Sequence, residues 1–143
     1  MRRALLVVVA LVALYLYSYF LVLGIGYAMA TLTPTWWQSM FSTRGQAALT
    51  WMVFCHSVAV LVVSFPFAYL IQRIYGRYGP VVALAMTLTL FVMFALPAWR
   101  YIGDSPTRFK VVTIFDQIKL VCVLPVLVWA FGKLPSNNRW SGP

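Results

Sequence analysis

The chain has 143 residues, of which 63% are hydrophobic and only 9% are charged, a balance far from that of a soluble globular domain. Its formal net charge of +9 comes from eleven Lys and Arg residues against two acidic residues. These cations lie mostly at the ends of apolar segments, where they can meet lipid phosphates, and they form no basic run of the nucleic-acid-binding type. Composition therefore predicts an integral membrane protein and argues against nucleic acid as a partner.

The first apolar segment covers residues 4–30, which is long enough for a helix to cross a hydrocarbon core of about 30 Å. Its apolar run exceeds the roughly 7–15 residues of a signal-peptide core, so we expect an uncleaved helix. Tyr15 and Tyr19 are four residues apart and share a face of this helix. Because their hydroxyls need partners at such depth, we expect this face to point into a helix bundle.

Residues 31–47 form the first loop, in which Thr33-Pro34-Thr35 predicts the start of a helix with Thr35 as its cap. The apolar side chains that follow fall on one face of one or two helical turns. Such a pattern is typical of a short interfacial helix that lies flat on a membrane. This face is either an ordinary aromatic belt or a surface for a partner. Its residues are Trp36, Trp37, Met40 and Phe41.

The second apolar segment covers residues 48–72, and small polar side chains recur along it at seven-residue spacing. A stripe of this kind favours close packing between membrane helices, so we predict that it contacts a partner or a neighbouring helix. The residues of the stripe are Thr50, Ser57 and Ser64.

The third segment covers residues 80–98 and follows the second after a very short loop, so the two should form an antiparallel hairpin. The fourth segment covers residues 111–132. We predict a protein of the bacterial inner membrane, and a slight excess of Lys and Arg on the loops of one side favours an orientation with both termini in the cytoplasm. Basic residues of the loops are predicted to contact lipid headgroups. They are Arg73, Arg77, Arg100, Arg108 and Lys110.

Three polar side chains interrupt the apolar segments: His56 in the second, and Asp116 and Lys119 in the fourth. Asp116 and Lys119 are three residues apart, so they share a helix face and can pair. Helix rise places all three at a similar depth, and a charge in hydrocarbon costs about 2.5–3.5 kcal/mol, which favours the bundle interior. The pattern leaves open whether Asp116 pairs with Lys119 or His56. It also leaves open whether the cluster fixes helix packing, binds a partner or ligand, or couples to ions.

The chain has few groups that could carry out chemistry. It contains one histidine and two acids, and it lacks a metal-ligand cluster, a convincing catalytic triad and a glycine-rich phosphate loop. Cys55 and Cys122 lie inside apolar segments without a C-x-x-C pair, which predicts buried thiols rather than disulfides. We therefore predict neither an enzyme nor a bound cofactor or metal.

Together these features predict an all-α fold in which residues 1–143 form a single domain. The domain would be a polytopic membrane protein, a four-helix transmembrane bundle with short loops and one short interfacial helix. The predicted function is a non-catalytic accessory or structural subunit, bound by helix–helix contacts to other membrane subunits or to its own copies. Two alternatives are a small ion- or proton-coupled transporter that uses Asp116 and an immunity-type protein against a membrane-acting toxin.

Overall fold

A computed structural model describes the backbone of residues 2–95 and 107–133, and the side chains of residues 4–93 and 110–133. These residues are helical or lie in short turns and loops, and none of them is in a strand, so the predicted all-α class is confirmed. Most residues lie in four helices with a fifth of only four residues. The helices are α1 (Arg2–Ala30), α2 (Thr35–Gln38), α3 (Arg44–Tyr75), α4 (Gly79–Leu90) and α6 (Thr107–Lys133).

Three stretches of the described residues are long and apolar enough to cross a membrane, judged by length and composition. They are Ala4–Ala30, Arg44–Met93 and Lys110–Lys133. The second stretch contains both α3 and α4, which the 3-10 turn Gly76–Tyr78 joins. α4 has 12 residues, about 18 Å of helix, which is shorter than a hydrocarbon core of about 30 Å. It continues into the π-helical turn Phe91–Ala95, and residues 96–98 of the predicted third segment lie outside the described residues.

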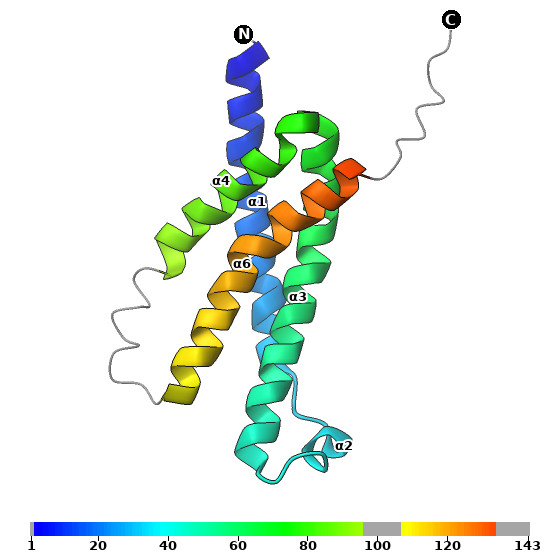
Figure 1. Cartoon of the computed structure of the whole chain (residues 1–143), viewed down its shortest axis with the longest axis vertical. Coiled ribbons are helices and arrows are strands. Elements are labelled where there is room, and N and C mark those ends of the chain that lie inside the picture. Colours follow the sequence, from blue (N-terminus) through cyan, green and yellow to red (C-terminus); the bar gives the residue numbers. More distant parts are fainter. Residues whose placement is uncertain (1, 96–106, 134–143) are drawn as a thin grey trace, which may run out of the picture.

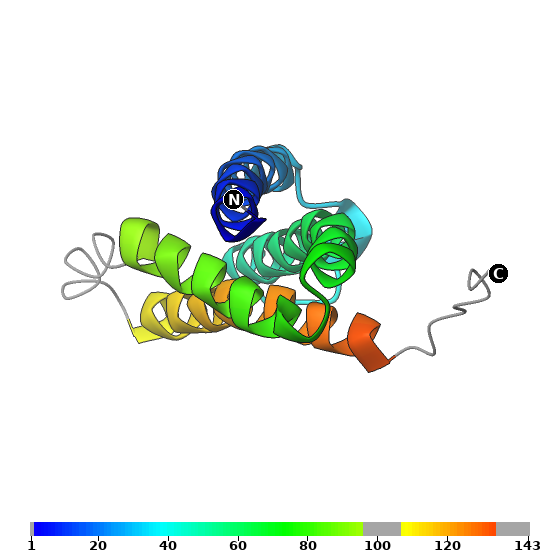
Figure 2. The same ribbon diagram turned by 90° about the horizontal axis from the view of Figure 1, so that it is seen from above.

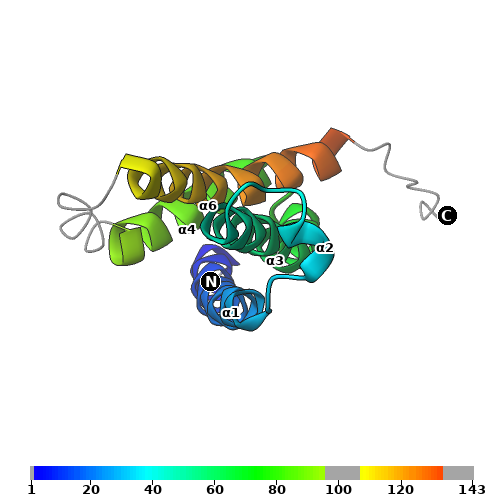
Figure 3. The same cartoon turned by 90° about the horizontal axis from the view of Figure 1, so that it is seen from below.

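α3 is the central helix of the fold. α1 packs along one side of it, whereas α4 and α6 lie against the other side, as the views from the two ends show (Figure 2 and Figure 3). The beginning of α1 and the end of α6 lie at the same end of the molecule (Figure 1). This layered arrangement leaves α1 in contact mainly with α3, so much of its surface is uncovered.

The ends of α3 are fixed by local chemistry, and they extend the helix beyond the predicted residues 48–72. Thr43 caps its first turn, because its hydroxyl accepts a hydrogen bond from the backbone N–H of Gln46 at 3.3 Å. The helix ends at Tyr75 because Gly76 adopts a φ of 53°, which favours glycine. The turn that follows brings α4 back along α3, as the predicted hairpin requires.

A core of buried side chains joins α3 to the helices on both of its sides. Gly24 lets α1 approach closely, since a Cβ there would lie 3.2 Å from Val63 Cγ2 on α3. On the other side α6 leans away from its initial course in its second half, and this half contains Pro125 (Figure 1). The core residues are Tyr17, Leu21, Val60, Ala68, Ile71, Ala83, Met86, Leu90, Leu124 and Val128.

Candidate functional site

The polar side chains that interrupt the apolar segments meet between α3 and α6. Asp116 Oδ1 lies 2.6 Å from Lys119 Nζ, three residues further along α6, and 3.1 Å from His56 Nδ1 on α3. Asp116 therefore contacts both of the partners that the sequence offered as alternatives. Lys119 Nζ also donates a hydrogen bond to Ser57 Oγ at 2.7 Å. We call these four residues, His56, Ser57, Asp116 and Lys119, the polar cluster.

The polar cluster is largely enclosed by the helices. The side chains of His56, Asp116 and Lys119 are 13%, 21% and 12% exposed. Asp116 Oδ1 and His56 Nδ1 have no partner of hydrogen-bond geometry in the described part of the chain. Their close contacts are therefore electrostatic contacts rather than hydrogen bonds. With a neutral imidazole, the carboxylate and the ammonium cancel. Compensation of this kind lowers the cost of burying each charge, and it links α3 to α6.

No group of three or more His, Cys, Asp or Glu residues that could hold a metal ion occurs among the described residues. In the polar cluster, Lys119 lies against the carboxylate oxygen that a metal ion would need. This arrangement can lock two helices together, and it places a carboxylate beside an imidazole inside an apolar span.

The Thr50, Ser57 and Ser64 stripe serves three different neighbours in the same chain. Thr50 accepts a hydrogen bond from Trp37 Nε1 in α2 at 3.1 Å, and Ser57 accepts one from Lys119 in α6. Ser64 is fully buried and bonds the hydroxyl of Tyr17 in α1 at 2.9 Å. A seven-residue spacing drifts by about 20° per repeat on a straight helix, so the stripe turns from one neighbour to the next. Contact of this stripe with another protein stays a prediction.

The aromatic residues after Pro34 are only partly surface groups. α2 is present as a single four-residue turn that begins at Thr35, and Pro34 precedes it without a side-chain cap, so the prediction of Thr35 as the cap is wrong. Trp37 packs against Trp51 of α3, with their ring centres 5.2 Å apart. Phe41 packs on Trp37 at 5.8 Å, whereas Trp36 and Met40 are 56% and 67% exposed. Trp37 and Phe41 are therefore part of the packing against α3, whereas Trp36 and Met40 are largely at the surface.

The expectation for Tyr15 and Tyr19 is wrong, because their side chains are 69% and 53% exposed. Tyr17, about 200° around the helix from Tyr15, is the buried tyrosine. Neither exposed hydroxyl has a hydrogen-bond partner among the described residues. Gly24, seven residues after Tyr17, lies on the side of α1 that approaches α3 and is the sequence signal that could have located the buried face.

The predicted headgroup residues lie in different surroundings. Arg73 donates a hydrogen bond to the hydroxyl of Tyr69 at 3.3 Å, and Arg77 donates one to the hydroxyl of Tyr78 at 2.7 Å. Arg100 lies outside the described residues, and only the backbone of Arg108 is described, within α6. Lys110 is half-buried at the start of the described side chains of α6. Their contacts with lipid stay predictions.

Sequence reasoning missed Gln72, which lies where α3, α4 and α6 converge. With its amide oriented to suit its neighbours, its nitrogen donates to the carbonyls of Val128 at 3.3 Å and Gly76 at 3.2 Å. Gly79 and Gly132 make room for it, because a Cβ at either position would lie within 3 Å of the amide. These two glycines were the only signal in the sequence, and they come from segments far apart in the chain.

No family model, curated protein or solved structure matches this chain. Its three long apolar helices are compatible with an integral membrane protein.

Proposed function

We propose that this chain is an integral membrane protein of the bacterial inner membrane and acts as a non-catalytic accessory subunit of a larger membrane complex. Its helices would form a four-helix transmembrane bundle with both termini in the cytoplasm, and α4 would be the short member. The outer face of α1 would bind a membrane helix of another subunit. The observation that carries this proposal is the exposure of Tyr15 and Tyr19 in the middle of α1.

The depth of these tyrosines is the reason that they call for a partner. Each lies about 17 Å from the nearer end of the stretch Ala4–Ala30, so both would be near the centre of the bilayer. Lipid tails offer no hydrogen-bond acceptor there, and an unpaired hydroxyl in an apolar environment costs about 1–3 kcal/mol. A neighbouring helix with a hydroxyl, an amide or a free carbonyl at this depth would remove the cost.

Several other polar groups of the long helices contact one another within the chain, which supports a packing role. Tyr17 bonds Ser64, and the polar cluster links α3 to α6. Near the beginning of α1, the hydroxyl of Tyr75 donates to the carbonyl of Leu6 at 2.7 Å. Because α1 packs mainly on α3, its outer face remains available to another protein.

Changing Tyr15 and Tyr19 together to phenylalanine tests this proposal, because the change removes two hydroxyls and keeps both rings. Hydrogen bonds between membrane helices contribute about 0.6 kcal/mol on average and up to about 1.7, so the loss of two of them should lower affinity for the partner by about eightfold, and by up to about three-hundredfold. The yield of crosslinked partner is measured in native membranes with a photo-crosslinker placed at Val22, which is exposed on the same face of α1. One subunit should be captured in high yield, and the double variant should reduce that yield.

Tyr27→Phe is the matched control, since Tyr27 is 77% exposed but lies near the end of α1. It should leave the yield unchanged. An equal yield from the double variant and the wild type would contradict the proposal. A crosslinked product of twice the chain mass would also contradict it, because the partner would then be a second copy.

A second candidate function is ion- or proton-coupled transport, which the contact of Asp116 with His56 favours. A carboxylate 3.1 Å from an imidazole in an apolar span is the pairing of groups that proton relays in membrane proteins use. In proteoliposomes with an internal pH-sensitive dye, Asp116→Asn should abolish a proton flux that the wild-type chain supports. Gln117→Leu, the next residue of α6, should retain it. A flux that survives Asp116→Asn would exclude this function.

A further inference from the structure

A pocket with two cations lies at the end of the molecule where α3 turns into α4. It has a volume of about 390 Å³, within the range of roughly 300–1,000 Å³ that is usual for small-molecule sites. Three segments contribute to it: the end of α3, the turn with the start of α4, and the end of α6. The lining residues are Gln72, Gly76, Arg77, Pro80, Trp129, Gly132 and Lys133.

The two cations of this pocket have no acidic partner among the described residues. Arg77 lies over the Tyr78 ring, with its guanidinium carbon 4.7 Å from the ring centre. Lys133 Nζ lies 5.7 Å from the centre of the Trp129 ring. Asp116 is the one acid of the described part of the chain. It is ion-paired with Lys119 and lies about 25 Å along α6 from Lys133, beyond the Debye length of about 8–10 Å.

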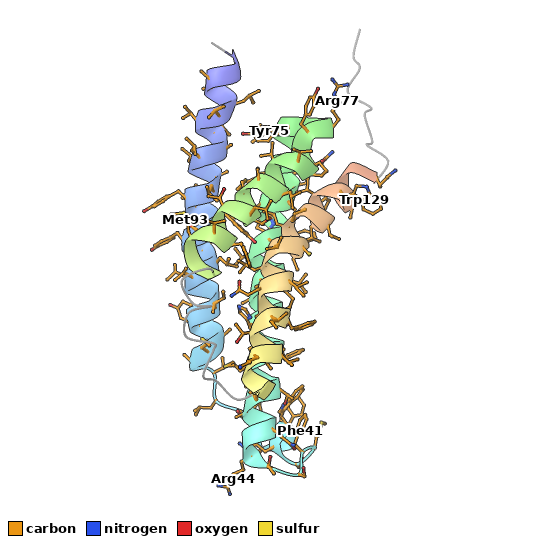
Figure 4. The ribbon with its side chains drawn as sticks, turned by 60° about the vertical axis from the view of Figure 1, so that its left-hand side comes forward. Phe41, Arg44, Tyr75, Arg77, Met93 and Trp129 are labelled. Carbon is orange, nitrogen blue, oxygen red and sulfur yellow. The ribbon has the colours of Figure 1, made fainter. Side chains whose placement is uncertain are left out.

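Backbone dipoles do not decide the sign of the ligand. α3 and α6 point their negative C-terminal ends toward the pocket, and α4 points its positive N-terminal end there. These contributions oppose one another, so the two side-chain cations determine the field. Figure 4 shows Arg77 and Trp129 at the same end of the molecule, opposite Phe41 and Arg44.

We propose that this pocket binds a phosphate group that carries a net negative charge, held by Arg77 and Lys133. A guanidinium can donate two parallel hydrogen bonds to phosphate oxygens, and an ammonium adds a compact charge. An indole at such a position suits the boundary between lipid tails and headgroups. The phosphate would come from an anionic phospholipid or from free phosphate in solution. The pocket is separate from the outer face of α1, so the test of phosphate binding does not depend on whether the proposed partner subunit binds there.

Native mass spectrometry of the full-length protein in neutral detergent tests the site by counting bound phosphatidylglycerol. A diffuse attraction to anionic lipid amounts to about 1 kcal/mol per cation, so each Arg→Gln or Lys→Gln change would weaken binding about fivefold wherever it lies. The pocket predicts a different result. Arg77→Gln and Lys133→Gln should each weaken binding more than about tenfold. Arg73 is an exposed cation of the same region outside the pocket, so Arg73→Gln should weaken binding less than about threefold.

Charge-conserving variants and competitors complete the test. Lys133→Arg should retain most of the binding and Arg77→Lys only part of it, because lysine keeps the charge but not the two parallel hydrogen bonds. These variants separate a charge effect from a folding defect. Zwitterionic phosphatidylcholine should bind more weakly than phosphatidylglycerol. Displacement of the lipid by millimolar inorganic phosphate would identify free phosphate as a ligand of the site, and resistance to it would identify the lipid. Equal losses for Arg73, Arg77 and Lys133, or no loss at all, would overturn the proposal.

Discussion

Replacement of Asp116 with leucine is expected to lower the free energy of unfolding by about 3 kcal/mol, because it leaves the Lys119 ammonium without its carboxylate. Removal of one partner from a buried ion pair costs about 3–5 kcal/mol, and the partial exposure of both side chains places the expected value at the lower end. The hydrogen bond from Lys119 to Ser57 remains, but a neutral hydroxyl cannot balance the charge. Titration of the purified protein with a denaturing detergent gives the measurement.

Two further variants separate the ion pair from simple loss of side-chain volume. Lys119→Leu should be less harmful than Asp116→Leu, because the carboxylate keeps His56 at 3.1 Å as a polar neighbour, whereas Lys119 has no other acid beside it among the described residues. The double variant should be more stable than either single variant, since no buried charge is left unpaired. If the losses of the two single variants simply add, the two charges do not interact and the contact between them does not stabilise the fold.

The meeting of His56, Asp116 and Lys119 could be anticipated because two simple measures agree. Spacing along one helix places Asp116 and Lys119 on a common face, and distance from the segment ends places His56 at a similar depth. Ser57 was assigned to a separate stripe, although it accepts the hydrogen bond of Lys119. Its role depends on the rotation of α3 against α6, which the residue pattern of a single helix does not contain.

The orientation of α1 could not be predicted from hydropathy. Nearly every residue of Ala4–Ala30 is apolar, so no polar stripe distinguishes the side that packs on α3 from the side that faces away. The need of Tyr15 and Tyr19 for hydrogen-bond partners therefore predicts that they face the bundle, but both lie on the outer face of α1. Close packing decides the orientation instead, through Gly24 and the hydrogen bond of Tyr17 to Ser64.

The observed orientation of α1 changes what Tyr15 and Tyr19 indicate about partners. In the interior of the chain their hydroxyls would be satisfied by neighbouring helices and would indicate nothing about other proteins. On the outer face of α1 they keep the need for a partner, which the chain itself does not meet. Their position on the outer face of α1, opposite to the predicted one, is therefore what supports the proposed contact with another subunit.

Replacement of Gly79 with alanine is expected to lower the free energy of unfolding by about 2 kcal/mol, a value typical of overpacking. The added Cβ would lie 2.7 Å from the Gln72 amide and 2.9 Å from Val128 Cγ1. Gln72 can turn its amide, but Val128 is fully buried and has no room to move. The backbone at Gly79 has φ −48° and ψ −53°, which alanine adopts without strain, so the loss comes from packing alone. Detergent titration measures it as before.

Two other glycines provide matched controls for this prediction. The three atoms nearest to a Cβ at Gly132 all belong to the Gln72 amide, which can turn, so Gly132→Ala should cost less than about 1 kcal/mol, and Gln72→Ala should remove that cost. Gln72→Ala should rescue Gly79→Ala only in part, because Val128 stays in place. A Cβ at Gly26 would have no neighbour within 4 Å, so Gly26→Ala should be neutral or slightly stabilising. If Gly79→Ala is as stable as Gly26→Ala, the close approach of α4 to α6 does not limit the stability of the fold.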